Sequence, residues 1–421
     1  MSGRWLVLCL IGMSVGCSSE AGPAPLGEQP VLPGEQGDGG RTPPISLTPS
    51  PDAGSNRSPP LTRAIAAGFD FACLLSDDGQ VCCGGANYAG QLGRGTMTEE
   101  PLRPALVGAF DHDVIDLASS ATATCAVRKD GSVWCWGTGS VVASGARVSA
   151  TPARVMGIDK AVRIGMNTLA GCTLSSTDEV TCFGDVGWLG DGRPGGQNVT
   201  YGVATNVLQG PVRALHFGSA RIATSAGDGT LKSWGSSWSS RDLSPVPVHA
   251  PGTFDFRTFG GVTVGSGHAC GLQADGTMWC WGENMYGAMG VGKVEAGNIH
   301  VNGAPADRHQ LTQVTNLPFA AKRVAALGYT TCVLDTAGAI SCFGSFGDVS
   351  GYSPVPRQVT TLGNDNVDLI ASSNAICAKR KDGSFACWSG FTPDSVVATN
   401  SIFHVPAVFS CDVNAEPFVV R

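Results

Sequence analysis

Charged residues are scarce in this sequence, and long apolar runs are missing from most of it. Only 14% of the 421 residues are charged and the formal net charge is −7, whereas about 25% are charged in a typical globular protein. The acidic balance argues against electrostatic binding to nucleic acid or to an anionic membrane surface. Beyond the N-terminus no run of 18 apolar residues occurs, so the sequence predicts no membrane-spanning helix.

Motifs of enzyme active sites are missing as well. The sequence contains no P-loop and no CxxC or HExxH pattern, and no pairing of a nucleophile with a base is evident. Several predicted turns contain an aspartate, which local turn chemistry explains better than calcium binding does. These aspartates are Asp78, Asp130, Asp228, Asp275 and Asp382. We therefore expect a protein without enzymatic activity, cofactor or bound metal.

Glycine, proline and cysteine are abundant instead, with 58, 25 and 16 residues. So many cysteines are typical of oxidising compartments. Residues 1–16 agree, because Arg4 precedes a short apolar stretch, as in an export signal peptide. Gly16 directly precedes Cys17, which resembles the lipobox of bacterial lipoproteins, where this cysteine carries the lipid. We expect an outer-membrane or surface lipoprotein of the cell envelope. Cleavage near Ala21 or Ala24 is the alternative and would give a secreted protein.

Residues 17–62 form the next segment, the predicted lipidated N-terminus and linker. From residue 18 to 62 the chain holds ten of the 25 prolines and very few aromatic or β-branched residues. Such a composition cannot bury enough surface to offset the entropy of ordering. We expect a disordered tether that holds a folded body away from a membrane. A simple low-complexity tail is equally compatible with the composition.

Cysteine spacing then indicates an internal repeat of about 50 residues. A Cys-x9-Cys unit occurs six times, and a seventh copy has Ala223 and Ser233 at the cysteine positions. The first positions of the seven units lie 52, 47, 51, 47, 62 and 45 residues apart. The six pairs are Cys73 with Cys83, Cys125 with Cys135, Cys172 with Cys182, Cys270 with Cys280, Cys332 with Cys342, and Cys377 with Cys387.

Each unit predicts a β-hairpin with a three-residue turn. The third turn residue must be left-handed, which favours glycine and tolerates aspartate, and it is glycine in six units and Asp178 in the other. Counting outward from Gly131, Cys125 lies opposite Cys135 in a non-hydrogen-bonded pair, with Cα atoms about 4.5 Å apart. This separation allows a disulfide. Metal binding by the cysteines is the alternative, but it requires more closely spaced ligands.

The repeat resembles the regulator of chromosome condensation (RCC1) type of β-propeller repeat. The fifth unit, GSGHACGLQADGTMWCWGENMYGAMG, carries the motif best, and the first retains GANYAGQLGRG. The resemblance implies an all-β fold, a seven-bladed β-propeller over residues 63–421 behind a disordered Pro- and Gly-rich tether. It also implies that His268 is a hydrogen-bonded framework residue. The best-known activity of this family, nucleotide exchange on a small nuclear GTPase, does not suit an exported protein.

A short strand with an alternating pattern is predicted after each hairpin, starting near residues 103, 151, 203, 244, 310, 355 and 405. The last strand lies near the C-terminus, so it either completes the seventh blade or clasps the first. Cys82 and Cys411 fall outside the six pairs and outside the N-terminal segments. A disulfide between them, which would staple the two ends of the propeller, is a hypothesis.

Two features are candidates for recognition. An aromatic residue follows the second cysteine position at a similar spacing in six units: Tyr88, Trp188, Trp238, Tyr286, Phe346 and Phe391. This spacing predicts a ring of binding residues on one face, and packing between blades is the alternative. Residues 293–309 form a polar insertion, which we expect to protrude either as a recognition loop or as a tolerated insertion.

These features favour a non-enzymatic, lipid-anchored propeller that binds a protein or a glycan outside the cytoplasm. We expect it to be a monomer that reaches the membrane only through its lipid and does not bind nucleic acid. The second hypothesis is an inhibitor or regulator of an exported hydrolase.

Overall fold

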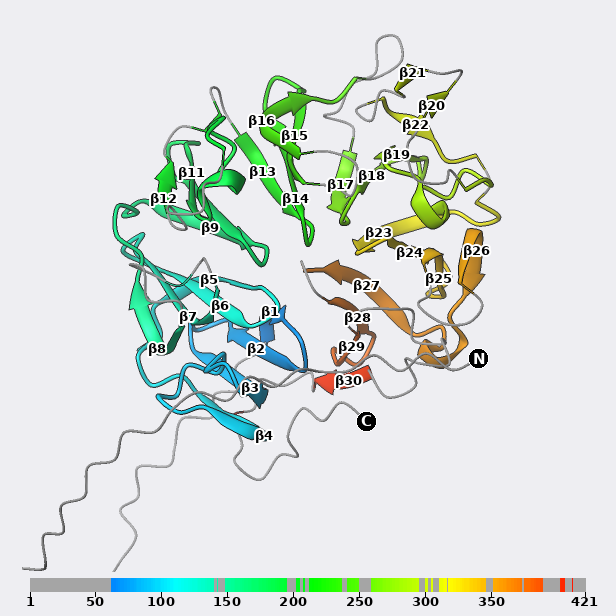
Figure 1. Cartoon of the computed structure of the whole chain (residues 1–421). Helices are drawn as coiled ribbons and strands as arrows, with labels where there is room; N and C mark the ends of the chain where they lie inside the picture. The colour runs from blue at the N-terminus through cyan, green and yellow to red at the C-terminus, as the bar shows by residue number, and fades with distance from the viewer. Residues whose placement is uncertain are drawn as a thin grey trace, which may run out of the picture. The chain divides into compact units, whose positions relative to one another are not determined.

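Each repeat folds into a four-stranded antiparallel sheet whose strands follow one another along the chain (Figure 1). The first three sheets consist of β1 (Thr62–Ala67), β2 (Phe71–Ser76), β3 (Val81–Asn87) and β4 (Thr98–Leu106); β5 (Val114–Ser119), β6 (Ala123–Arg128), β7 (Val133–Thr138) and β8 (Val148–Arg154); and β9 (Ala161–Met166), β10 (Ala170–Ser175), β11 (Val180–Gly184) and β12 (Gly202–Ala204). The fourth and fifth consist of β13 (Val212–Phe217), β14 (Arg221–Ala226), β15 (Leu231–Ser236) and β16 (Arg241–Pro247); and β17 (Phe259–Val264), β18 (His268–Gln273), β19 (Met278–Gly282) and β22 (Thr312–Gln313). The last two consist of β23 (Ala321–Leu327), β24 (Thr330–Asp335), β25 (Ile340–Ser345) and β26 (Tyr352–Gln358); and β27 (Asn366–Ala371), β28 (Ile376–Arg380), β29 (Phe385–Trp388) and β30 (Ile402–Val405).

The remaining elements are short. The predicted insertion contains a two-stranded sheet of β20 (His300–Val301) and β21 (Ala304–Pro305), and 3-10 helices occur at η2 (Val186–Trp188), η4 (Met285–Gly287) and η5 (Thr360–Leu362). This computed structural model describes residues 62–139, 142, 148–194, 202–204, 207–208, 212–236, 241–249, 259–294, 300–301, 304–305, 310–315, 317–345, 351–372, 375–388, 402–405 and 411. Cys17 and the predicted tether lie outside these residues, except for Thr62, which begins β1 instead.

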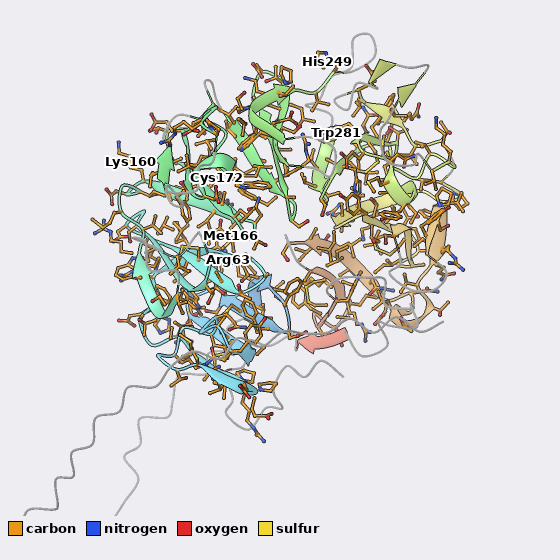
Figure 2. The ribbon with its side chains drawn as sticks, viewed as in Figure 1. Arg63, Lys160, Met166, Cys172, His249 and Trp281 are labelled. Carbon is orange, nitrogen blue, oxygen red and sulfur yellow. A yellow bond between two sulfur atoms is a disulfide. The ribbon has the colours of Figure 1, made fainter. Side chains whose placement is uncertain are left out.

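The first strand of every sheet lies at the centre of a ring. Residues of β1, β5, β9, β13, β17, β23 and β27 together line one central cavity of about 720 Å³. Met166, on β9, lies beside this centre, and Cys172 and Trp281 lie farther out in the ring (Figure 2). The predicted fold class, an all-β seven-bladed propeller, is confirmed.

The hairpin turns adopt the predicted geometry. The third turn residue has a positive φ in all seven blades: Gly79, Gly131, Asp178, Gly229, Gly276, Gly338 and Gly383. Aspartates in these turns accept local hydrogen bonds; Asp130 Oδ1, for instance, accepts from Ser132 N at 2.9 Å and from Ser132 Oγ at 2.6 Å. These two bonds lower the pKa of Asp130. Turn chemistry therefore accounts for this carboxylate, as expected.

The register places the two cysteine positions opposite each other in every blade. All six predicted disulfides are present: Cys73 with Cys83, Cys125 with Cys135, Cys172 with Cys182, Cys270 with Cys280, Cys332 with Cys342, and Cys377 with Cys387. Their Cα–Cα distances are 4.0 to 4.1 Å, slightly shorter than the expected 4.5 Å. Each bonded pair lies in the buried core, at 0 to 3% exposure. The sulfur atoms therefore crosslink the two middle strands of six blades from within.

The fourth blade has an ionic contact where the others have sulfur. Ala223 pairs with Ser233, and the guanidinium of Arg221 donates to Asp242 Oδ2 at 2.7 Å and to Ser233 Oγ at 3.4 Å. Arg221 is 5% exposed. These contacts connect β14, β15 and β16, so a buried polar group braces the blade that lacks a disulfide.

Large aromatic residues fill six of the seven boundaries between blades. The residue after the second cysteine position is Trp136, Phe183, Trp234, Trp281, Phe343 or Trp388, each 0 to 2% exposed. Each of these rings packs into an apolar cluster shared with the preceding blade. In the first blade this position is Gly84, so the boundary between the seventh and first blades has no ring there.

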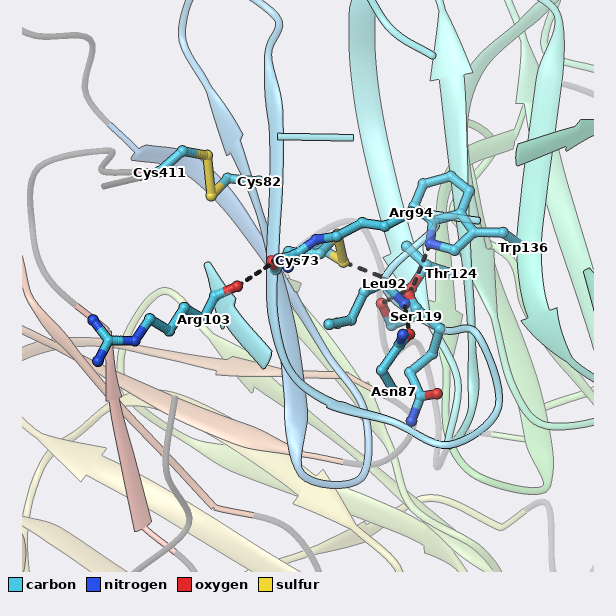
Figure 3. Close-up of a disulfide and its surroundings, with 12 residues drawn as sticks. Cys73, Cys82, Asn87, Leu92, Arg94, Arg103, Ser119, Thr124, Trp136 and Cys411 are labelled. Carbon is cyan, nitrogen blue, oxygen red and sulfur yellow. Dashed lines mark hydrogen bonds between the residues drawn. A yellow bond between two sulfur atoms is a disulfide. The ribbon is translucent and has the colours of Figure 1, made fainter. Parts of the chain in front are cut away.

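That boundary is closed in another way. β30 pairs with β29, so the C-terminal strand completes the seventh blade rather than clasping the first, and it lies slightly earlier than predicted. Cys82 lies in a cluster with residues of the seventh blade and forms the hypothesised disulfide with Cys411, 329 residues away (Figure 3). Ser372 Oγ also donates to Ala67 O at 3.0 Å. Among the described residues no strand is exchanged between the first and seventh blades, and side chains and one disulfide hold the ends of the ring together.

The first strand of each sheet is an edge strand, which leaves backbone N–H and C=O groups without a partner strand. Bulges and side chains protect these groups. In all seven, the register shifts close to one end of the strand, as in the β-bulges that protect edge strands. Side chains of one blade also cap the edge of the next: Asp116 Oδ2 accepts from Ile164 N at 2.9 Å, and Thr263 Oγ1 accepts from Ala326 N at 2.7 Å. Burial raises the pKa of Asp116.

His268 links the fifth blade to the sixth. Thr331 Oγ1 donates to Ala288 O at 2.8 Å, so His268 Nε2 donates to Thr331 Oγ1 across 2.7 Å. His268 is 1% exposed, and its Nδ1 has no hydrogen-bond partner among the described residues. Burial lowers its pKa to about 4. The framework role implied by the family resemblance agrees with this bond.

Removing the Cys82–Cys411 disulfide tests the ring closure. The double variant Cys82→Ser/Cys411→Ser should lose about 2–4 kcal/mol of unfolding free energy, because the bond constrains a very long segment of the unfolded chain. Hydrogen exchange should accelerate in the first and seventh blades. Cys125→Ser/Cys135→Ser is the control and should affect mainly its own blade boundary. Unchanged exchange in the two end blades would contradict this account.

Restoring the missing disulfide tests the register of the fourth blade. Ala223→Cys/Ser233→Cys should form a bond spontaneously on oxidation, because the two residues pair as the cysteines of the other blades do. The gain should be about 2–3 kcal/mol for such a short loop, measured by denaturant unfolding with and without reductant. Ala223→Cys alone is the control. Two free thiols in the oxidised double variant would show that the register is different.

His268 predicts a pH dependence of stability. An ordinary histidine has a pKa near 6.5, so between pH 6.5 and 4 the unfolded chain binds a proton here that the folded chain does not. The contribution of His268 to the unfolding free energy is therefore complete above pH 6.5. It is lost as the pH falls towards 4, by about 1.4 kcal/mol per pH unit. His268→Gln should flatten the fall in unfolding free energy over this range, with His249→Gln as an exposed control. Equal pH slopes for wild type and His268→Gln would refute this assignment.

Candidate functional site

The strands of each antiparallel blade alternate in direction, so two kinds of connection gather on each face of the ring. The turns between the second and third strands and the links to the next blade lie on one face, which we call the hairpin face. The turns between the first and second strands and the loops between the third and fourth lie on the other, the loop face.

Two long loops of the loop face share one framework. In the first blade Asn87 Oδ1 accepts from Leu92 N at 3.2 Å and its amide donates to Thr96 O at 2.9 Å. In the fifth blade Asn284 makes the matching bonds, with Met289 N at 3.0 Å and Lys293 O at 2.9 Å. One asparagine thus closes each loop from the inside.

These loops rest on the next blade. Trp136 Nε1 of the second blade donates to Gln91 O of the first at 2.8 Å (Figure 3). A Cβ added at Gly93 would lie 2.9 Å from that nitrogen, and one added at Gly290 would lie 2.8 Å from the Phe343 ring. Both glycines have a positive φ. The loop face is therefore anchored to the rigid ring.

The predicted aromatic ring is only partly present in the described residues. Tyr88 is 49% exposed and Tyr286 is 38% exposed, both on the loop face. Trp188 instead packs against the apolar cluster between the third and fourth blades. This position agrees with the alternative interpretation, in which the aromatic residues pack between blades. Trp238, Phe346 and Phe391 lie outside the described residues.

Tyr286 belongs to a cluster that the sequence did not reveal. Its ring centroid lies 5.7 Å from that of Tyr329 at an interplanar angle of 67°, and 6.2 Å from that of Tyr352 at 51°. Tyr329 comes from the turn between β23 and β24, and Tyr352 begins β26. The tyrosine cluster, Tyr286, Tyr329 and Tyr352, thus combines residues of the fifth and sixth blades and includes three of the five tyrosines of the chain.

Backbone strain marks the same position. Tyr286 has φ 60° and ψ 8°, one of four described non-glycine residues with positive φ. A bulky side chain seldom adopts this conformation, and such strain concentrates at functional sites. Yet Tyr352 is 50% exposed and Tyr286 is 38% exposed, so burial of these two rings does not explain the strain.

Other exposed apolar side chains also favour the loop face. Those at its turns and loops are Phe69, Tyr88, Met97, Val148, Tyr286 and Tyr352, whereas those at the connections of the hairpin face are Leu106 and Met156. Exposed aromatic side chains are typical of protein interaction surfaces. Within the described part of the chain, the loop face is the stronger candidate for recognition.

The central cavity is the second candidate. Burial lowers the pKa of His216, which lines it, to about 4. At its edge Arg323 Nε and Asp368 Oδ1 form an ion pair at 2.9 Å. No group of three metal-ligating side chains occurs among the residues that the structure describes, and none of its helices there is long and apolar enough to cross a membrane.

Comparison with known sequences identifies the repeat. Profiles of the regulator of chromosome condensation (RCC1) repeat match residues 78–127 and 261–288. The secretion-regulating guanine nucleotide exchange factor of Mus musculus is 29% identical over 138 residues, 30% of this chain and 28% of that protein. The ultraviolet-B receptor UVR8 of Arabidopsis thaliana is 26% identical over 254 residues, 55% of each chain. The match therefore spans under a third of the first relative and about half of the second.

Solved structures show the same architecture. Prp20p from Saccharomyces cerevisiae, described with its binding to Gsp1p and histones, superimposes with a TM-score of 0.59 at 19% identity, covering 73% of this chain and 78% of that one. Human WBSCR16 gives a TM-score of 0.58 at 16% identity, covering 76% and 90%. At such identities the likeness concerns the fold alone. The chain is thus a seven-bladed β-propeller that contains regulator of chromosome condensation (RCC1) repeats.

Proposed function

We propose that this chain is a non-enzymatic binding protein that acts outside the cytoplasm, held to the cell envelope by a lipid on Cys17, and that the loop face recognises its partner. The observation that carries the proposal is the tyrosine cluster, because exposed aromatic side chains on a rigid support are frequent hot spots of binding. Two of the relatives named above, a secretion-regulating guanine nucleotide exchange factor and an ultraviolet-B receptor, have names of regulatory proteins, which supports the same role.

The disulfides support the proposed location outside the cytoplasm. The structure contains seven disulfides, and so many are typical of proteins that fold in an oxidising environment outside the cytoplasm. The partner in this proposal is a protein or a glycan of the envelope. Inhibition of an exported hydrolase is the alternative, and it differs in that the captured partner would be an enzyme that loses activity when bound.

Capture from envelope extract tests the proposal. Full-length protein should retain a specific partner, and Tyr286→Gly/Tyr352→Ala should weaken that capture at least ~10-fold, because two anchors are lost. Glycine suits the left-handed backbone of residue 286, so the fold should be unchanged by circular dichroism. Leu106→Ala/Met156→Ala, on the hairpin face, is the matched control. Equal capture by the tyrosine variant, or loss only in the control, would refute recognition by the loop face.

A further inference from the structure

We infer that the tyrosine cluster is a cage for an alkylated ammonium group, as found in a quaternary amine or a methylated lysine side chain. The inference deepens the proposed function, because it names the ligand chemistry of the same surface. Cations bind over the faces of aromatic rings within about 6 Å of the ring centroid, and quaternary ammonium groups are the best-attested ligands of such cages.

The ring geometry suits a compact cation better than a flat ligand. Tyr286 meets Tyr329 edge to face and Tyr352 at a tilt, with centroids 5.7 and 6.2 Å apart. The ring planes are therefore inclined walls rather than one continuous platform. A sugar or a planar group needs a single flat face for stacking, whereas a rounded trimethylammonium group can contact two inclined faces together.

A buried carboxylate lies near one of these rings, that of Tyr329. A Cβ added at Gly267 would lie 2.6 Å from Glu283 Oε2 and 3.1 Å from Tyr329 Cε1, so the carboxylate and this ring border the same glycine. Glu283 is 2% exposed and directly precedes Asn284, which closes the loop that carries Tyr286. In this weakly solvated position a negative charge attracts a cation more strongly than it would in water. The net charge of −7 also attracts cations, and it does so over longer distances.

The cluster is also held in place before any ligand arrives. Gly287 packs on Pro354, since an added Cβ would lie 2.4 Å from Pro354 Cα, and this contact fixes Tyr286 against the strand that begins with Tyr352. Ser345 N donates to Tyr329 O at 2.9 Å and Ser266 N donates to Gly328 O at 2.6 Å, which fixes the turn of Tyr329. A preorganised site loses little conformational entropy on binding.

Alkylation matters because of hydration. An unmodified lysine ammonium is compact and strongly hydrated, so it loses much hydration energy when it enters an aromatic site. Methyl groups weaken that hydration and add dispersion contacts with the rings. Two sources can supply such a group, a free quaternary amine or a methylated lysine of a partner protein, and the experiment below separates them.

The test uses choline and its uncharged carbon isostere, 3,3-dimethylbutan-1-ol, with the full-length protein and ligand-observed NMR or calorimetry. Choline should bind at least ~10-fold more tightly than the isostere, because only choline carries the charge that the rings attract. Tyr352→Ala should weaken choline binding about 10-fold, Tyr352→Phe should retain most of it, and Glu283→Gln should weaken it several-fold. Tyr88→Ala, an exposed tyrosine of the same face outside the cluster, should have no effect. Equal binding of choline and isostere, or choline binding unchanged in both Tyr352→Ala and Glu283→Gln, would overturn the inference.

A second arm identifies the source of the group and separates this inference from the proposed function. A peptide with trimethyl-lysine, compared with the same peptide with unmodified lysine, should bind better than choline if the ligand is a protein, whereas choline should match it if the ligand is a free amine. If choline binds as expected but no partner is captured from extract, the cage stands and the proposed function fails. If a partner is captured and neither choline nor the trimethyl-lysine peptide displaces it or binds, the proposed function stands and the cage is refuted.

Discussion

The left-handed residue that ends each hairpin turn fixes the register of the second and third strands, and much of the molecule depends on that register. Gly131, with φ 82°, sets Cys125 opposite Cys135, and Asp178, with φ 61°, does the same for Cys172 and Cys182. A slip by one residue would turn every side chain of a strand to the opposite face. The disulfides would then be lost, together with the aromatic residue that follows the second cysteine position in six blades and the boundaries that it fills.

Alternation along a strand also explains two adjacent cysteines with different roles. Neighbouring residues of a strand point to opposite faces of the sheet, so Cys83 lies in the cluster shared with the second blade and Cys82 in the cluster shared with the seventh. The first blade has Gly84 where the other six have a large ring. Its boundary with the seventh blade is therefore the one without that ring. The same boundary is closed by the Cys82–Cys411 disulfide, whose cysteines are 329 residues apart in the sequence. Covalent closure offsets weaker packing at the point where the chain ends meet.

Contacts within one repeat could be predicted from the sequence, and contacts between repeats mostly could not. Turn conformations and cysteine register follow from spacings of about ten residues, which one hairpin determines. The number of blades follows from the seven copies of the repeat together with the family resemblance. The Cys82–Cys411 pairing was reached only by elimination. The tyrosine cluster was missed because Tyr329 and Tyr352 join Tyr286 across a blade boundary, and the rotation between blades is not encoded in the repeat length. The contact from Arg221 to Asp242 lies within the fourth blade but was also missed, because it occurs in the one unit without cysteines and no pattern of the repeat indicates it.

The loops of the first and fifth blades are both closed by an asparagine. Comparing them distinguishes the residues that hold the loop in place from those that are available for recognition. Asn87 and Asn284 make matching hydrogen bonds, and each loop carries an exposed tyrosine, Tyr88 or Tyr286. In the second blade, however, the position that corresponds to Tyr329 is Thr122, and the fourth strand begins with Val148 instead of tyrosine. The same backbone therefore supports one tyrosine in the first case and three in the second. Because the loop is held by backbone bonds and by a ring of the next blade, the side chains around it can change without loss of the fold, and a boundary between blades is where recognition chemistry can vary most freely.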